Sequence, residues 1–322
     1  MKKMLVILGP TATGKTDLAL SLAKIFDGEL VACDSRQVYQ GLNVGTGKMP
    51  SKNAKFKIKN QKWEIDEIPV HMYDVADPKI QFTVKDYVKK SEQVVEDILR
   101  RKKLPIIVGG TGLYLKALLE GLPNLEIPVD QKLRGELEKL SLEKLQNKLQ
   151  LLSPTTWKKL NNSDRNNKRR ILRSIELIHM YPYMRPRNKR KMINDKYNVL
   201  KIGLTAPRQV LYEKIDRRLI AQIDQGLIKE GKTLRQKGLT LKRMRQLGLE
   251  YGILADLLEG KINQEQFTKI LSTKIHQYAK RQQTWFKKEK DVLWFNISTL
   301  DMSEKVEKAV TSWYHAGDDK KN

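Results

Sequence analysis

A complete phosphate-binding motif, G-x-x-x-x-G-K-T, occupies Gly9-Pro10-Thr11-Ala12-Thr13-Gly14-Lys15-Thr16 near the start of the 322-residue chain. The apolar run at residues 4–8 precedes it, and residues 17–26 follow with apolar side chains at helical spacing. A loop between a strand and a helix is the setting that this motif requires. Its backbone N–H groups and the helix N-terminus converge on phosphate oxygens, Lys15 neutralises the terminal phosphates, and Thr16 can hold Mg²⁺. The motif therefore predicts binding of a diphosphate or a triphosphate such as ATP, without saying which.

Strand-like and helix-like segments alternate through the rest of the first third of the chain. Short apolar runs at residues 29–33, 71–75 and 106–108 predict strands, whereas residues 82–101 and 113–119 have helical spacing. Such alternation favours a parallel sheet with helices on both faces. The predicted fold class is α/β, with a P-loop NTPase-like parallel sheet flanked by helices.

The middle of the chain has a different pattern. No strand signal appears from 130 to about 180, where leucines and then isoleucines repeat at helical spacing, and the Pro-, Arg- and Lys-rich stretch 181–196 predicts an exposed connection. Beyond it we expect a strand at 197–204, helices at 208–237 and 264–288, a strand at 292–295 and a frayed end at 318–322. The predicted domains are a catalytic core of residues 1–120 plus 197–322 and an all-helical insertion of residues 121–196.

Positive charge is concentrated beyond the first third. The chain has 62 Lys and Arg against 37 Asp and Glu, for a net charge of +25. Residues 1–120 carry 20 basic and 14 acidic side chains, net +6, which leaves +19 for the remainder. Residues 151–200 alone carry 13 basic and 3 acidic side chains, net +10. Such a field usually faces a polyanion such as nucleic acid, although a lysine-rich composition without any such partner gives the same numbers.

Several classes of protein are excluded or disfavoured by composition. The apolar runs are far too short to span a bilayer or to form the core of a signal peptide, so no membrane association is expected. The one cysteine, Cys33, cannot form an internal disulfide, and no Cys/His spacing suggests zinc. We therefore expect a cytoplasmic protein.

Asp34 is the candidate carboxylate beside the phosphate loop. A nucleoside triphosphatase usually has an aspartate at the end of an apolar strand to position Mg²⁺, yet the strand at 106–108 is followed by Gly109-Gly110-Thr111. Asp34 ends the strand that comes next after the loop. Its position favours a role facing the substrate, and a helix N-cap is the structural alternative.

Six motifs in a fixed order give the chain a family resemblance. GPTATGKT (9–16), DSRQVY (34–39), GTGK (45–48), VGGTGLY (108–114), RRILR (169–173) and AKRQQTWF (279–286) occur in this order. The chain thereby resembles the tRNA dimethylallyltransferases, also called tRNA isopentenyltransferases. The resemblance implies transfer of a dimethylallyl group from dimethylallyl diphosphate to N6 of the adenosine 3′-adjacent to the anticodon. It also implies Mg²⁺ as cofactor and an insertion that grips the anticodon stem-loop, and we expect a monomer.

The resemblance also implies roles for individual residues. Asp34 would take the proton from the attacking amine, Thr111 would contribute to the reaction centre, and Arg218 would hold the leaving diphosphate. The phosphate loop, Gly9 to Thr16, would bind the donor, with Mg²⁺ at Thr16. The residues implied to contact tRNA are Asp34, Ser35, Arg36, Gln37, Thr111, Arg134, Arg169, Arg170, Arg173, Arg245, Gln246, Gly248, Lys280, Arg281, Gln282 and Trp285. Reaching the adenosine requires the enzyme to pull it out of its stack.

The sequence departs from the family pattern in two places. Many members carry G-Y-x-E where this chain reads Gly248-Leu249-Glu250-Tyr251, and the usual paired histidines before Asp74 are here His71-Met72-Tyr73. His71 is therefore predicted to be structural.

Three alternatives remain at this level: a small-molecule kinase, a prenyltransferase acting on free adenine nucleotides, and an RNA-binding module without activity. The net charge of +19 beyond residue 120 argues against the kinase. The basic insertion and the tRNA-type motifs argue against a prenyltransferase acting on free nucleotides. An inactive RNA-binding module is disfavoured by the intact site residues, which are Lys15, Thr16, Asp34 and Thr111.

Overall fold

The computed structural model describes residues 1–49, 55–60, 62–180 and 193–316. The chain divides into two compact units, Met1–Leu119 with Ile193–Asn322 and Glu120–Met192. Residue 120 and residues 193–196 therefore change units relative to the expected division, since 120 was expected in the core and 193–196 in the insertion.

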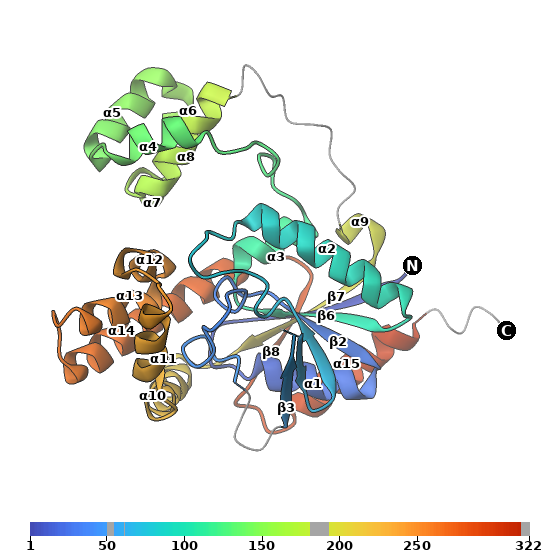
Figure 1. Cartoon of the computed structure of the whole chain (residues 1–322). Coiled ribbons are helices and arrows are strands. Elements are labelled where there is room, and N and C mark those ends of the chain that lie inside the picture. The colour runs from blue at the N-terminus through green and yellow to red at the C-terminus, as the bar shows by residue number, and fades with distance from the viewer. Residues whose placement is uncertain (50–54, 61, 181–192, 317–322) are drawn as a thin grey trace. The chain divides into compact units, whose positions relative to one another are not determined.

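The first unit is built on one eight-stranded sheet in the order β3-β4-β5-β2-β6-β1-β7-β8 (Figure 1). The six strands from β5 to β8 are parallel, and β3 and β4 add an antiparallel hairpin at one edge. The strands are β1 (Lys3–Leu8), β2 (Gly28–Ala32), β3 (Phe56–Lys59), β4 (Lys62–Ile65), β5 (Ile68–His71), β6 (Leu104–Gly109), β7 (Asn198–Thr205) and β8 (Val292–Asn296). The central strands β1, β2 and β6 are almost wholly buried, which is typical of a parallel sheet covered on both faces.

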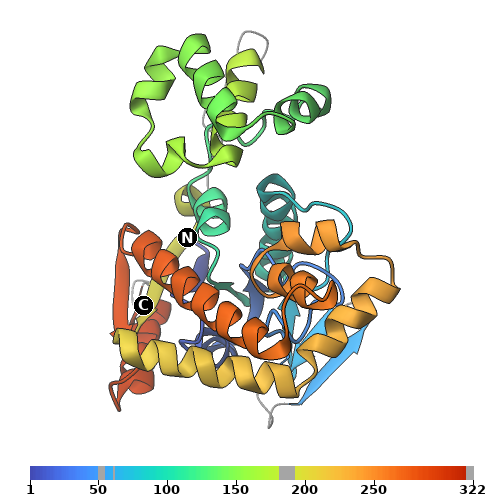
Figure 2. The ribbon, with the colours of Figure 1, turned by 90° about the vertical axis from the view of Figure 1, so that its left-hand side faces the viewer.

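Helices cover both faces of this sheet, as the alternating pattern predicted. Figure 1 shows α2 and α3 on one face and α1 and α15 on the other. A further group, α10 to α14, lies in front of the sheet in Figure 2, where α10 is yellow and α14 orange-red. The helices of this unit are α1 (Lys15–Ile25), α2 (Val84–Arg100), α3 (Gly112–Leu119), α9 (Ile193–Lys196), α10 (Arg208–Asp224), α11 (Leu227–Gln236), α12 (Leu241–Leu247), α13 (Leu249–Leu258), α14 (Gln264–Phe286) and α15 (Met302–His315).

The second unit is helical throughout its described part, as expected. Its core contains Leu137, Leu145, Leu149, Ile171, Leu172 and Ile175, all of them buried. The apolar repeats that predicted the helices thus supply its interior. The helices are α4 (Gln131–Glu138), α5 (Leu142–Leu152), α6 (Pro154–Lys159), α7 (Asn162–Arg165) and α8 (Lys168–Met180).

Three sequence-based expectations about elements need correction. The strand expected at 71–75 ends at its first residue, because Met72 and Asp74 adopt positive φ angles of 68° and 55° that break an extended chain. The helix expected over 208–237 is two helices, because Gly226 adopts φ 98° between them. Of the exposed connection expected at 181–196, residues 181–192 lie outside the described part, and α9 with buried Ile193 follows. The expected frayed end at 318–322 also lies outside it.

Candidate active site

The phosphate loop follows β1 and has the wrapped backbone that the motif predicts. Gly9, Ala12 and Gly14 have φ angles of 145°, 63° and 78°, and α1 begins at Lys15 directly after Gly14. The Thr13 hydroxyl donates to the Pro10 carbonyl at 2.9 Å and so braces the loop from within. The N-terminal N–H groups of α1 are therefore presented toward the cavity described below, which is the geometry of an anion site.

Lys15 lies inside this loop. Its ammonium donates to the Pro10 carbonyl at 2.5 Å. Burial and, to a lesser extent, the positive charge of Arg218 lower the pKa of Lys15 to about 7, although the carboxylate of Asp34 opposes the shift. The charged form of Lys15 is therefore unfavourable in the absence of a ligand, and a bound anion would stabilise it.

Asp34 lies just beyond the end of β2 and forms a tight turn with the residues that follow. Its Oδ1 accepts the backbone N–H of Arg36 at 2.7 Å and of Gln37 at 3.3 Å. Within the described residues, Oδ2 accepts no hydrogen bond. One oxygen therefore fixes the side chain, and the other remains available for a substrate proton.

Thr111 is brought beside Asp34 by the end of β6. Its Oγ1 accepts the Ser35 N–H at 3.0 Å, and its own N–H donates to the Cys33 carbonyl at 3.1 Å. The backbones come so close that a Cβ on Gly109 would lie 2.1 Å from the Cys33 oxygen, so only glycine fits there. Burial raises the pKa of the Cys33 thiol to about 12, which leaves this cysteine a structural rather than a reactive group.

A cavity of about 460 Å³ joins these groups at the carboxyl ends of β1, β2 and β6. It is lined by the loop from Thr11 to Thr16, by Asp34 and Arg36, and by Arg218 of α10. Arg218 donates to the Thr11 hydroxyl at 3.3 Å and to the Thr46 carbonyl at 3.4 Å. All three residues predicted to act in the reaction thus lie at one site. Asp34 and Arg218 line the cavity, and Thr111 accepts a hydrogen bond from Ser35, the residue next to Asp34.

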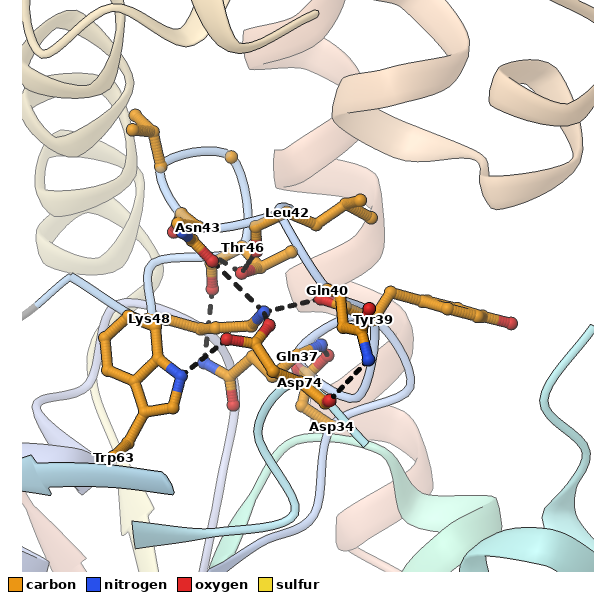
Figure 3. Close-up of polar contacts among 12 residues, drawn as sticks. Asp34, Gln37, Tyr39, Gln40, Leu42, Asn43, Thr46, Lys48, Trp63 and Asp74 are labelled. Atoms are coloured by element: carbon orange, nitrogen blue, oxygen red, sulfur yellow. Dashed lines mark hydrogen bonds and ion pairs between the residues drawn. The ribbon is translucent and has the colours of Figure 1, made fainter. Parts of the chain in front are cut away.

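A buried ionic cluster supports the wall of the cavity (Figure 3). Lys48 donates to Asp74 Oδ1 at 2.5 Å and to the Tyr39 carbonyl at 2.6 Å. Trp63 of the β3–β4 hairpin donates to Asp74 Oδ2 at 2.6 Å. A third acceptor, Asn43 Oδ1, lies 3.3 Å from the ammonium. The three hydrogen bonds that Lys48 can donate are thus made to residues of the protein and not to a ligand.

His71 is paired away from the cavity. Its Nε2 lies 2.7 Å from Glu29 Oε2, and Glu29 is also bonded to Arg101. These partners fit the structural role predicted for His71.

Three residues of the site were not singled out from the sequence. Glu250 and Tyr278 line the cavity, and Glu230 holds one of its loops. Burial raises the pKa of Glu250 to about 7 and also raises that of Tyr278. Glu250 lies in the segment that departs from the family pattern, which was the one available signal.

The residues predicted to contact tRNA fall into several groups. Ser35, Arg36 and Gln37 lie beside Asp34, and Arg36 and Gln37 line the cavity. Lys280 and Arg281 are exposed on α14, and Gln246 is exposed on α12. Gly248 caps α13 and lies near Arg36, and Trp285 packs against Gly112.

Several of the predicted tRNA contacts also have partners within the protein. Gln282 is buried, accepts the Thr11 N–H at 2.9 Å and donates to the Gly110 carbonyl at 2.8 Å. Arg245 pairs with Asp256 at 2.8 Å. In the helical unit, Arg134 and Arg173 both pair with buried Glu176, at 2.5 Å and 3.2 Å.

Arg169 and Arg170 differ from these two. Both are exposed on α8, and Arg170 pairs with Asp164. The contacts predicted between all of these residues and tRNA stay predictions.

The fold and the site together define a P-loop protein whose phosphate loop shares a cavity with a carboxylate and an arginine. The family model described as IPP transferase matches residues 37–289. A relative from Halothermothrix orenii, named tRNA dimethylallyltransferase, is 37% identical over 306 residues, which are 92% of this chain and 88% of its own length. The chain belongs to the IPP transferase family.

Solved structures give the same result. The tRNA isopentenylpyrophosphate transferase of Bacillus halodurans is 32% identical, with a TM-score of 0.68 over 97% of each chain. A eukaryotic dimethylallyltransferase whose crystallographic snapshots show it acting on tRNA is 25% identical, with a TM-score of 0.76 over 98% of this chain and 79% of its own. The P-loop fold predicted from the sequence is confirmed.

None of the described helices is both long and apolar enough to cross a bilayer. Within the described residues, no group of three or more His, Cys, Asp or Glu side chains is arranged to hold a metal ion. Mg²⁺ commonly binds through one or two protein ligands together with substrate phosphates, so the single hydroxyl of Thr16 at the cavity fits that mode of binding.

Proposed function

We propose that the protein transfers a dimethylallyl group from dimethylallyl diphosphate to N6 of the adenosine 3′-adjacent to the anticodon in tRNA, with release of diphosphate. The observation that carries this proposal is the pairing, in one cavity, of a phosphate loop with a carboxylate that keeps one oxygen available. A phosphate site alone would serve many reactions, whereas a base beside it suits attack by a weakly acidic N–H.

The reaction needs one bond to form and one to break. The exocyclic nitrogen of adenine bonds to the allylic carbon, the carbon–oxygen bond to diphosphate breaks, and its electron pair stays on the diphosphate oxygen. Asp34 Oδ2 accepts the proton that the nitrogen loses. The turn N–H groups of Arg36 and Gln37 hold the carboxylate in place while it does so.

Charge on the leaving diphosphate is stabilised by groups already at the site. Lys15 and the N–H groups at the start of α1 face it from one side, and Arg218 faces it from α10. Mg²⁺, held by Thr16 and by the diphosphate itself, would neutralise part of the developing charge. Within the described part of the chain, the hydrogen-bond partners of Arg218 are the neutral groups of Thr11 and Thr46, so its charge remains available for the donor.

The acceptor side of the proposal rests on charge and on family membership. We infer that tRNA docks with its anticodon stem-loop and that exposed basic residues such as Arg169 and Lys280 contact its backbone. We also propose that the protein is a monomer. The tRNA substrate and the single buried cysteine support a cytoplasmic location.

Nucleoside analysis after incubation tests the function directly. The protein is incubated with Mg²⁺, unmodified tRNA and either dimethylallyl diphosphate or ATP, and the tRNA is digested to nucleosides. We expect N6-dimethylallyladenosine with the prenyl donor only. A phosphorylated product with ATP would indicate a kinase, and prenylation of free AMP but not of tRNA would indicate the nucleotide-specific alternative. No product with either donor would overturn the proposal.

A further inference from the structure

Glu230 of α11 holds three consecutive backbone N–H groups of the cavity loop 42–48. Its Oε2 accepts from Asn43 at 2.8 Å and from Val44 at 2.7 Å, and its Oε1 accepts from Gly45 at 3.2 Å. Hydrogen bonds to an ionised carboxylate are stronger than those between neutral groups. One side chain therefore fixes the backbone of half of this loop.

A fourth donor completes the arrangement. The Tyr251 hydroxyl donates to Glu230 Oε1 at 2.7 Å, and its ring is fully buried. The loop lies so close to it that a Cβ on Gly45 would be 2.7 Å from the hydroxyl oxygen. The Glu230 carboxylate and its four donors thus form one packed unit between α11, α13 and the loop.

The next two residues of the loop contact Arg218. The Thr46 carbonyl accepts from its guanidinium, and a Cβ on Gly47 would lie 1.8 Å from Nη2. Gly47 also has φ 64°, a conformation that favours glycine. The guanidinium is therefore seated directly on this backbone, and its position depends on where the loop lies.

The two ends of the loop have separate supports. Lys48 is held by Asp74 and the Tyr39 carbonyl in the buried cluster of Figure 3, which fixes the far end. Gln222, one helical turn from Arg218 on α10, donates to the Val44 carbonyl at 2.6 Å. Among the described residues, the carboxylate of Glu230 is the acceptor for the N–H groups of Asn43, Val44 and Gly45.

We propose that Glu230, assisted by Tyr251, is a positioning residue for donor binding: it sets the loop against Arg218 and so aims the guanidinium at the diphosphate. This inference rests on the proposed function, because it assumes that Arg218 binds the donor's diphosphate. Glu230 itself does not touch the donor. Its contribution reaches the ligand through Thr46 and Gly47.

A double-mutant cycle with inorganic pyrophosphate as the probe tests the inference. The variants are Glu230→Gln, Arg218→Ala and the double variant, and calorimetry in the presence of Mg²⁺ gives each dissociation constant. Glutamine keeps the size but loses one acceptor oxygen and the charge. We expect Glu230→Gln to weaken pyrophosphate binding about tenfold in the wild-type background and hardly at all in the Arg218→Ala background. Its dissociation constant for tRNA should stay within about twofold.

Glu213→Gln is the matched control, since Glu213 is an exposed glutamate on α10. It should leave both dissociation constants unchanged. An equal loss of pyrophosphate affinity in both backgrounds would overturn the inference, because Glu230 would then act independently of Arg218. Equal losses for pyrophosphate and tRNA would also overturn it, since they indicate general damage to the fold.

If Glu230→Gln does not fold, Tyr251→Phe decides. It removes one hydroxyl and keeps the buried ring, and we expect pyrophosphate binding to weaken about threefold in the presence of Arg218 and not in its absence. No change in either background would overturn the inference. Failure of the proposed function gives a different result, because the wild-type protein would then bind no pyrophosphate or form no prenylated tRNA.

Discussion

Replacement of Asp34 by asparagine should stop the chemistry while leaving the site assembled. The oxygen that organises the turn, Oδ1, accepts the N–H groups of Arg36 and Gln37, and an asparagine can keep both bonds. What it loses is the charge and the basic Oδ2. General bases contribute on the order of 10²–10⁴ in rate, so we expect the chemical step to slow at least about 10²-fold, or about 2.7 kcal/mol.

The sign of the effect on donor binding separates this role from a binding role. Asp34 carries negative charge in the same cavity as the phosphate loop, so removing that charge cannot weaken an anion's attraction to the site. Pyrophosphate should therefore bind Asp34→Asn as tightly as the wild type or more tightly. A loss of affinity would mean that Asp34 acts through metal or donor binding instead.

Single-turnover transfer of a radiolabelled dimethylallyl group to tRNA, with enzyme in excess, measures the chemical step itself. Asp34→Ala is the matched control, because it also removes the oxygen that accepts the two N–H groups of the turn. Each lost hydrogen bond should lower the free energy of unfolding by about 1 kcal/mol, which would appear as a lower melting temperature. Asp34→Asn should melt near the wild type. A single-turnover rate of Asp34→Asn within about threefold of the wild type would refute the assignment of Asp34 as the base.

Four further predictions follow from named groups. Lys15→Ala should weaken pyrophosphate binding by at least about tenfold and leave the filter-binding constant for tRNA unchanged, and the reverse pattern would contradict assignment of the loop to the donor. Because burial lowers the pKa of Lys15 to about 7, pyrophosphate binding at pH 8 should take up a proton that Lys15→Ala does not take up, as calorimetry in buffers of different ionisation enthalpy would show. Arg169 is exposed, so Arg169→Ala should reduce the slope of log Kd for tRNA against log salt concentration by about one unit without changing stability. Arg173→Ala breaks a pair with buried Glu176 and should instead lower the melting temperature of the protein. An unchanged slope for Arg169→Ala would mean that the tRNA binds elsewhere. Native Cys33 should resist maleimide at neutral pH, since it is buried and its pKa is raised to about 12, and rapid labelling would show that the end of β2 opens.

The parts of the site that the sequence predicted are those encoded locally. The phosphate loop is a contiguous motif between a strand and a helix, and Asp34 follows β2, the next strand along the chain, which β6 separates from β1 in the sheet. Both statements concern residues close in sequence, so periodicity and motif spacing were enough to place them. Arg218 was predicted only through the family resemblance, because nothing in the helical pattern of α10 distinguishes it from Arg217.

The parts that the sequence did not predict depend on contacts between distant segments. Glu230 is separated from Gly45 by 185 residues, and only the folded chain brings its carboxylate to that backbone. The β3–β4 hairpin was missed although its apolar residues alternate, with Phe56 and Ile58 opposite Ile65 and Trp63 on one face. Each strand has only four residues and two apolar side chains, which is too short a run to stand out among the polar residues around it.

The charge pattern shows most clearly where composition ceases to be informative. Arg134, Arg169 and Arg173 contribute alike to the net charge, yet two of the three are paired with buried Glu176 and one is exposed. A buried carboxylate needs such partners, since leaving it unpaired would cost several kcal/mol. Part of the basic charge of the insertion therefore stabilises that unit and is not free to attract RNA.

The basic residues of the cavity differ from those of the helical unit. Lys15 and Arg218 face each other there, and their hydrogen-bond partners are neutral oxygens of Pro10, Thr13, Thr11 and Thr46. Burial and the charge of Arg218 lower the pKa of Lys15 to about 7, so holding Lys15 charged in the folded protein costs stability. This cost is present in full below about pH 7 and shrinks as the pH rises toward the ordinary pKa of lysine. A diphosphate offsets both effects, because it adds negative charge to that of Asp34 in the cavity. Ligand binding should therefore stabilise the protein as well as position the donor. Among the described residues, the two cations of the cavity have no carboxylate as a hydrogen-bond partner, unlike the paired arginines of the helical unit.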